Sequence, residues 1–225
     1  MTALPNLRVA AIELRLIPLV GYLLLAVALA LLALTHGPLE LARNWQRHFI
    51  ENMEAFVPLS LALLSAPMLI ADSEQGMVEL NATLPHRAIL TVRFLAVWAV
   101  SWAFLLAGAE FMNLLWGPVP FWSGVLAAFG PAVFLTGVAF WATLITARVS
   151  VGYLVVIGLC VTDLILKILG AFATVPALQL IDTFSYRWAT PALSWWVPKV
   201  FMLAVGIVLI VQAIRLVARY WSRSL

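Results

Sequence analysis

Residues 123–146 read SGVLAAFGPAVFLTGVAFWATLIT, an apolar run that contains no charged side chain. A helix of about twenty residues crosses the roughly 30 Å hydrocarbon core of a bilayer, so this run is long enough to be a membrane span. Five further runs have the same character, with ends at about 16–34, 55–71, 94–115, 151–172 and 198–218. The sequence lacks the alternating apolar and polar tracts of a membrane barrel. It therefore predicts an all-α membrane protein with six transmembrane helices.

The composition of the whole chain agrees with this prediction. Of its 225 residues 64% are hydrophobic and 10% are charged, whereas soluble domains carry about 25% charged residues. No linker divides the chain, so we expect a single multi-pass domain over residues 1–225 in the cell (inner) membrane. The basic residues are spread along the sequence and the net charge is only +3, so we expect no nucleic-acid partner. Cys160 is the only cysteine, which excludes an internal disulfide or a cysteine-based metal cluster.

The distribution of Lys and Arg near the span ends predicts the orientation, because cytoplasmic loops carry an excess of these residues. With the N-terminus inside, the cytoplasmic ends hold Arg8, Arg15, Arg87, Arg93, Arg148, Arg215, Arg219 and Arg223, and the outer ends hold Arg43, Arg47, Arg187 and Lys199. The larger set is the cytoplasmic one. We therefore expect both termini in the cytoplasm.

Two further segments have the periodicity of amphipathic helices. In the first, apolar residues recur at helical spacing before the first span, at Leu4, Leu7, Ala11 and Leu14. This segment predicts an N-terminal interfacial helix on the inner leaflet. In the second, apolar residues repeat every four positions after Pro38, at Leu41, Trp45, Phe49 and Met53, with charged residues on the other faces. This pattern predicts a second amphipathic helix, lying on the outer surface.

The connection between spans two and three is the one strongly polar loop, residues 72–93, DSEQGMVELNATLPHRAILTVR. Met77, Leu80 and Leu84 give it an apolar ridge that can fill a groove on a soluble partner. Glu74 and Glu79 flank this ridge and can pair with basic residues on the partner, which sets register more than affinity. The alternative is an ordinary solvated loop without a partner.

Six spans with both ends inside, an amphipathic N-terminal helix and this loop resemble the ABC-2 type permease family of ATP-binding-cassette exporters. The local match is Glu74-x-Gly76-x-x-Glu79-Leu80-x-x-x-Leu84-Pro85, followed by His86-Arg87. Gly76 permits a backbone turn and Pro85 ends the short helix. The topological resemblance covers nearly the whole chain, and the sequence motif covers about twenty residues. In that family this segment is the cytoplasmic coupling helix, which seats in a groove of the ATPase subunit.

The resemblance implies a transport subunit without enzymatic activity of its own. The sequence contains no Gly-Lys pair and hence no Walker-type phosphate loop, so ATP and Mg²⁺ would be bound by a partner ATPase. The three histidines, His36, His48 and His86, form no metal-binding motif. The expected partners are this ATPase, a second or related permease copy, and membrane lipids. The expected cargo is a lipid, drug or amphipathic peptide. The main alternative is a non-ATPase membrane scaffold or accessory protein that docks a cytoplasmic partner through residues 72–93.

Three charged residues, Glu110, Asp163 and Lys167, fall inside the predicted spans, where an unpaired charge costs several kcal/mol. Asp163 and Lys167 are four residues apart and can pair on one helix face. Glu110 reaches a similar depth to Lys167, so the three can form a cluster that joins spans three and five, with Asn113 nearby. The alternative is a polar patch on a translocation path. The small-residue pairs Ala103/Ala107 and Gly158/Thr162 predict close helix contacts.

Overall fold

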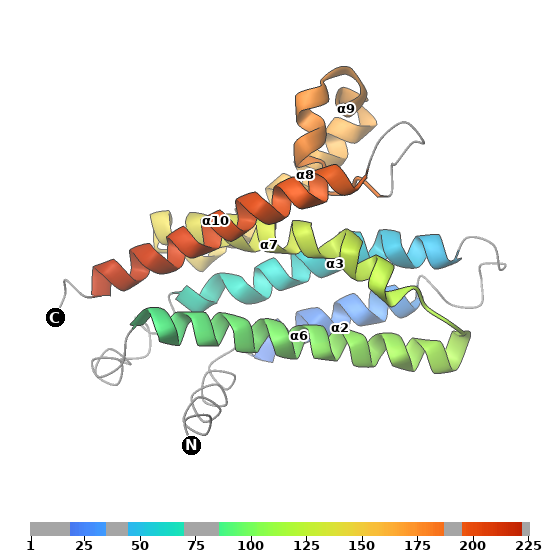
Figure 1. Ribbon diagram of the computed structural model, residues 1–225, viewed down its shortest axis with the longest axis horizontal. Helices are drawn as coiled ribbons and strands as arrows, with labels where there is room; N and C mark the ends of the chain where they lie inside the picture. The colour runs from blue at the N-terminus through green and yellow to red at the C-terminus, as the bar shows by residue number, and fades with distance from the viewer. Residues whose placement is uncertain (1–18, 35–44, 70–85, 187–194, 222–225) are drawn as a thin grey trace.

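A computed structural model describes residues 19–34, 45–69, 86–186 and 195–221 (Figure 1). These residues form helices joined by turns, and no strand occurs among them. The longer helices are α2 (Leu19–Leu34), α3 (Trp45–Ser65), α6 (His86–Trp116), α7 (Phe121–Thr146), α8 (Val149–Ile168) and α10 (Trp196–Trp221). The shorter ones are the 3-10 helix η1 (Ala66–Leu69), α9 (Ala171–Thr174) and the 3-10 helix η2 (Pro176–Ile181).

Five of the described helices are long and apolar enough to cross a membrane. They are Gln46–Met68, Leu90–Leu115, Phe121–Thr146, Val149–Ile168 and Trp196–Val217. The prediction of an all-helical, multi-pass membrane protein is therefore confirmed. The first predicted span coincides with α2, whose 16 described residues fall just short of the roughly 17–25 residues of a membrane span. The predicted N-terminal interfacial helix lies outside the described residues.

Helix α7 is the centre of the bundle and packs against α3, α8 and α10. In Figure 1 it runs between α10 and α3. A helix that is apolar on all sides is suited to this position, because it can bury every face. Many of its buried residues are small, which lets the neighbouring backbones approach, as at Ala127, Ala128, Gly130, Ala132 and Ala139.

A close contact between helices joins α7 to α10 at Gly206. A Cβ atom at this position would lie 2.6 Å from the backbone nitrogen of Phe134 and 2.6 Å from the carbonyl carbon of Val133, so only glycine fits. The contacts predicted at Ala103/Ala107 and Gly158/Thr162 are not formed among the described residues. All four residues are exposed, and a Cβ atom at Gly158 would meet nothing within 4 Å. Small-residue spacing identifies a face that permits close packing but not whether that face points inward.

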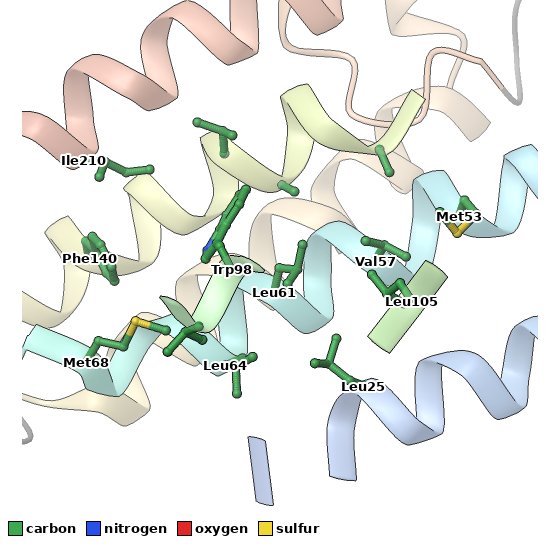
Figure 2. Packing of buried hydrophobic residues seen from close by; sticks show 14 of the residues in the cluster. Leu25, Met53, Val57, Leu61, Leu64, Met68, Trp98, Leu105, Phe140 and Ile210 are labelled. Carbon is green, nitrogen blue, oxygen red and sulfur yellow. The ribbon is translucent and has the colours of Figure 1, made fainter. Parts of the chain in front are cut away.

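Helix α3 corrects the predicted outer-surface helix. It starts at Trp45 and continues without a break through Pro58 to Ser65, so the described part of the predicted amphipathic segment is continuous with most of the predicted span two. An apolar stripe with helical spacing begins at Phe49 and continues into η1. Figure 2 shows its members Met53, Val57, Leu61, Leu64 and Met68. Because this stripe belongs to the core cluster, the apolar face of residues 49–54 lies in the bundle core, although Gln46 and Arg47 on the same helix are exposed.

Candidate functional site

Five charged residues with buried side chains gather towards one end of the bundle, where α8 ends and α10 begins. We call them the ion-pair cluster: Glu54 on α3, Asp163 and Lys167 on α8, Asp182 after η2, and Lys199 on α10. The most enclosed is Glu54, which is 0% exposed, followed by Lys199 at 4%. Ionised groups of this kind are stable in an apolar bundle only when they are paired and hydrogen-bonded.

One half of the cluster joins α3 to α10. The Nζ atom of Lys199 forms an ion pair with Oε1 of Glu54 and donates a hydrogen bond to the carbonyl oxygen of Thr183 at 2.6 Å. The same Glu54 oxygen accepts a hydrogen bond from the backbone N–H of Tyr186 at 2.8 Å. Both charged groups are therefore neutralised and hydrogen-bonded inside the protein.

The other half lies at the end of α8. Lys167 pairs with Asp163 one turn earlier, at 3.3 Å, and with Asp182 from the following segment. The Lys167 ammonium group also faces the ring of Phe184, with 5.1 Å between Nζ and the ring centroid, which is within cation–π range. This lysine is thus held by two carboxylates and an aromatic face.

The backbone of Thr183 connects the two halves. Its N–H donates to Oδ1 of Asp163 at 3.2 Å, while its carbonyl accepts from Lys199. A buried segment outside regular helices must find partners for its backbone groups, and here charged side chains of α3, α8 and α10 supply them. The cluster therefore fastens residues 182–186 to three helices.

Tyr186, at the end of this segment, adds an aromatic contact. Its ring packs against that of Trp195 with 5.2 Å between centroids. Burial raises the pKa of the Tyr186 phenol; Arg47 lowers it, and Glu51 and Glu54 raise it. The phenol consequently stays neutral at physiological pH. In the part of the chain that the structure describes, no three His, Cys, Asp or Glu residues come together to hold a metal ion.

The structure brings two of the three predicted intramembrane charges together, namely Asp163 and Lys167. It does not bring Glu110 to them: this residue is exposed on α6, where its carboxylate accepts a hydrogen bond from Asn113 Nδ2 at 3.0 Å. The second carboxylate on Lys167 comes instead from Asp182. Equal depth in the membrane brings two residues into contact only when their helices turn those faces towards each other, and α6 turns Glu110 outward.

Sequence reasoning missed Glu54, Asp182 and Lys199. The distribution of Lys and Arg places Lys199 at the outer end of a span, yet its side chain is 5% exposed and pairs with Glu54 of α3. The signal that could have found this pair is depth, because Glu54 immediately precedes the predicted span 55–71 and Lys199 is the second residue of the predicted span 198–218, so both lie at the outer ends of spans. Asp182 carries no such signal, since it follows a short 3-10 helix whose fold the sequence does not reveal.

A second set of polar contacts lies at the opposite end of the bundle, where η1 ends and α6 begins. Arg93 is 2% exposed and its Nη1 atom donates a hydrogen bond to the carbonyl oxygen of Met68 at 2.8 Å. One turn or so further along α6, Trp98 Nε1 donates to Ser65 Oγ at 3.1 Å. These two bonds join α6, which follows the connection at 70–85, to η1 and to the end of α3, which precede it.

The residues predicted to form the coupling helix are Glu74, Gly76, Met77, Glu79, Leu80, Leu84 and Pro85, and all of them lie outside the described residues. What the structure describes is the pair of helix ends from which this segment leaves and to which it returns. The last residue of η1 is Leu69, and α6 starts at His86.

Comparison of the chain with models of known protein families, with curated proteins and with solved structures found no match.

Proposed function

We propose that this chain is the permease subunit of an ABC-2 type exporter, with six spans and both termini in the cytoplasm of a cell (inner) membrane. It would work with a second permease copy and with cytoplasmic ATPase subunits that bind ATP and Mg²⁺. The sequence motif from Glu74 to Pro85 supports this proposal, because its apolar ridge and flanking acids suit docking in a groove. The five apolar helices supply the membrane-embedded body that such a subunit needs.

The observation that carries the proposal is the anchoring of both ends of the 70–85 connection. We call residues 74–85 the handle. A displacement of this segment can move the membrane helices only if both ends of the 70–85 connection are fixed to them. Here the bonds from Arg93 to Met68 and from Trp98 to Ser65 tie the base of this segment to the bundle core. A displacement of residues 74–85 would therefore act on α3 and α6 together.

The ion-pair cluster would then have a structural role in transport. It fastens α3, α8 and α10 to one another at the far end from the handle. Closure of the ATPase subunits would move the handle. The helices would then change their tilt, while the ion-pair cluster keeps α3, α8 and α10 together at their other ends. Because the exposed side chains of the spans are overwhelmingly apolar, the cargo we propose is a lipid, a drug or an amphipathic peptide.

A direct test is to disrupt the handle and look for the ATPase. In the double variant Glu79→Arg/Leu80→Asp the apolar ridge receives a charge and one flanking acid changes sign. We expect the purified permease to remain folded, since these side chains face the partner, and to lose the co-purifying ATPase and its transport activity. A matched control is Asp72→Arg/Ser73→Asp, which changes the net charge equally just before the motif and should keep both.

Full retention of the ATPase and of transport by the Glu79→Arg/Leu80→Asp variant would show that residues 74–85 are only a connection. If mild-detergent purification instead captures a partner without ATPase activity, and the same variant loses it, the chain is a membrane scaffold that docks this partner through the loop.

A further inference from the structure

An apolar groove lies between α6 and α10, with α7 as its floor. It has a volume of about 440 Å³, within the roughly 300–1,000 Å³ range of small-molecule sites. Its deeper surface is formed by Trp98, Val133 and Ile210, all of which are buried. Its two rims are formed by Leu95 on α6, which is 58% exposed, and Ile207 on α10, which is 49% exposed. The groove is therefore open to the surroundings of the bundle along its length.

The lining of the groove on α10 is about as long as one leaflet of a bilayer is deep. Its lining on α10 extends from Leu203 to Arg215, which are about 18 Å apart at a helical rise of about 1.5 Å per residue. One leaflet of a hydrocarbon core of about 30 Å is about 15 Å deep. An acyl chain that enters from the middle of the membrane would thus reach the membrane surface near Arg215.

Apart from Trp98, whose Nε1 atom donates to Ser65, the lining residues with polar side chains are Thr91 near the start of α6 and Arg215 near the end of α10. Arg215 is exposed and stands near the end of the apolar stretch Trp196–Val217. Among the described residues, it forms no ion pair. An arginine at this level extends its guanidinium group towards the headgroups and can bind a phosphate through two parallel hydrogen bonds.

We propose that this α6–α10 groove binds one anionic phospholipid of the surrounding bilayer. An acyl chain would lie between α6 and α10, and the lipid phosphate would pair with Arg215. The apolar lining, its extent along α10 and the cation at its end fit a lipid, which supplies an acyl chain and an anionic phosphate in one molecule. This binding site does not depend on the exporter proposal, since a scaffold protein could carry it as well.

The proposal is tested by lipid retention. The full chain is reconstituted into bilayers that contain equal amounts of phosphatidylglycerol and phosphatidylcholine, released in mild detergent and examined by native mass spectrometry. We expect a retained lipid with a preference for phosphatidylglycerol. Arg215→Gln should reduce this preference about fivefold, the factor that corresponds to roughly 1 kcal/mol for one basic residue near anionic lipid. Arg148→Gln, which changes an exposed arginine elsewhere on the bundle, should leave it unchanged.

Variants that fill the groove test the acyl-chain position. Ile207→Trp should remove the retained lipid, whereas Val208→Trp should not, because Val208 is similarly exposed at 52% but does not line the groove. Leu95→Trp fills the groove from the opposite rim and replaces Ile207→Trp if that variant fails to fold. Equal lipid retention by the groove-filling variants and Val208→Trp would overturn the proposal, as would an absence of headgroup preference in the parent chain.

A second copy of this chain is the competing occupant. Cysteine placed at Ile207, with Cys160 replaced by serine, should not form a cross-link between copies in the membrane. Efficient cross-linking at this position would show that another copy covers the groove, and the lipid proposal would then be abandoned. None of these measurements involves an ATPase, so their outcome leaves the exporter proposal to its own test.

Discussion

Removal of Lys199 should destabilise the bundle more than removal of any exposed cation. Lys199→Met deletes the ammonium group that pairs with Glu54 and donates to the Thr183 carbonyl, while keeping a side chain of similar length. Glu54 is 0% exposed, so water cannot replace the lost partner. The carboxylate keeps the hydrogen bond from the Tyr186 N–H, which limits the loss.

The magnitude follows from the environment of the pair. Removing one member of a buried ion pair costs about 3–5 kcal/mol in soluble proteins, and the membrane reference state reduces this cost. Because the Tyr186 contact also remains, we expect a loss near the lower end, about 3 kcal/mol. For a chain of this size, 1 kcal/mol corresponds to about 2–4 °C in melting temperature. The melting temperature should therefore fall by about 6–12 °C.

A double variant distinguishes the effect of losing the ion pair from the effect of changing the packing of the Lys199 side chain. Glu54→Gln removes the negative charge and retains an acceptor for the Tyr186 N–H. Combined with Lys199→Met, it should restore about 2 kcal/mol, since coupling energies between directly contacting residues reach about 0.5–3 kcal/mol. The remaining deficit, about 1 kcal/mol, reflects the Thr183 carbonyl, which has lost its donor.

The assay is thermal unfolding in one detergent at one scan rate, followed by intrinsic fluorescence. The matched control is Arg148→Met, which deletes an exposed cation and should shift the melting temperature by no more than about 1–2 °C. A Lys199→Met variant that melts with the parent, or a double variant that is destabilised by the sum of the two single changes, would refute the buried pair.

Three further predictions test other contacts of the bundle. Lys167→Met should lower the melting temperature, and adding Asp182→Asn should restore part of the loss, which would show that this carboxylate is a true partner. Gly206→Ala should destabilise the chain by about 1–3 kcal/mol because the new Cβ meets the α7 backbone, whereas Gly158→Ala, in open space, should be neutral or slightly stabilising in the same denaturation assay. A cysteine at Gln75, in a background without the native one, should resist an impermeant thiol reagent in intact cells and react in inside-out vesicles; labelling from outside would reverse the proposed topology.

The positions of the membrane helices could be read from the sequence with small errors. Residues 123–146 were predicted as a span, and α7 extends from Phe121 to Thr146. The span predicted at 198–218 lies within α10, Trp196–Trp221. Such agreement arises because long uncharged runs have one stable state in a bilayer, in which every backbone group is satisfied within the helix.

The start of α3 was predicted less well, for a physical reason. The charged residues on the other faces of the segment before residue 55 predict a helix on a surface, because carboxylates such as those of Glu51 and Glu54 are rarely buried. Both are buried, since Glu51 pairs with Arg47 at 2.8 Å and Glu54 pairs with Lys199. The partner of Glu54 lies 145 residues away in the sequence. Only the uninterrupted apolar stripe from Phe49 to Met68 could have indicated a single helix.

The candidate site could be predicted only in its local part. Asp163 and Lys167 pair across one turn, and this contact depends on helix periodicity alone. Every other contact in the cluster requires knowledge of which helix faces are neighbours and of how the segment after η2 folds back. The same limitation explains the error at Glu110. This residue reaches a similar depth to Lys167, but it lies on an exposed face of α6 that does not point towards α8.

The distribution of polar contacts along α3 has a mechanical consequence. Its first half is held by Glu54 in the ion-pair cluster, and its far end is held through Ser65 and Met68 by α6. Between them, the contacts of α3 with α7 are apolar, at residues such as Val57 and Leu61 (Figure 2). Hydrogen bonds and ion pairs depend steeply on geometry, whereas apolar contacts are non-directional and tolerate small displacements. A force applied through residues 70–85 should therefore move the end of α3 together with α6, by sliding the apolar middle against α7 while the ion-pair cluster stays closed.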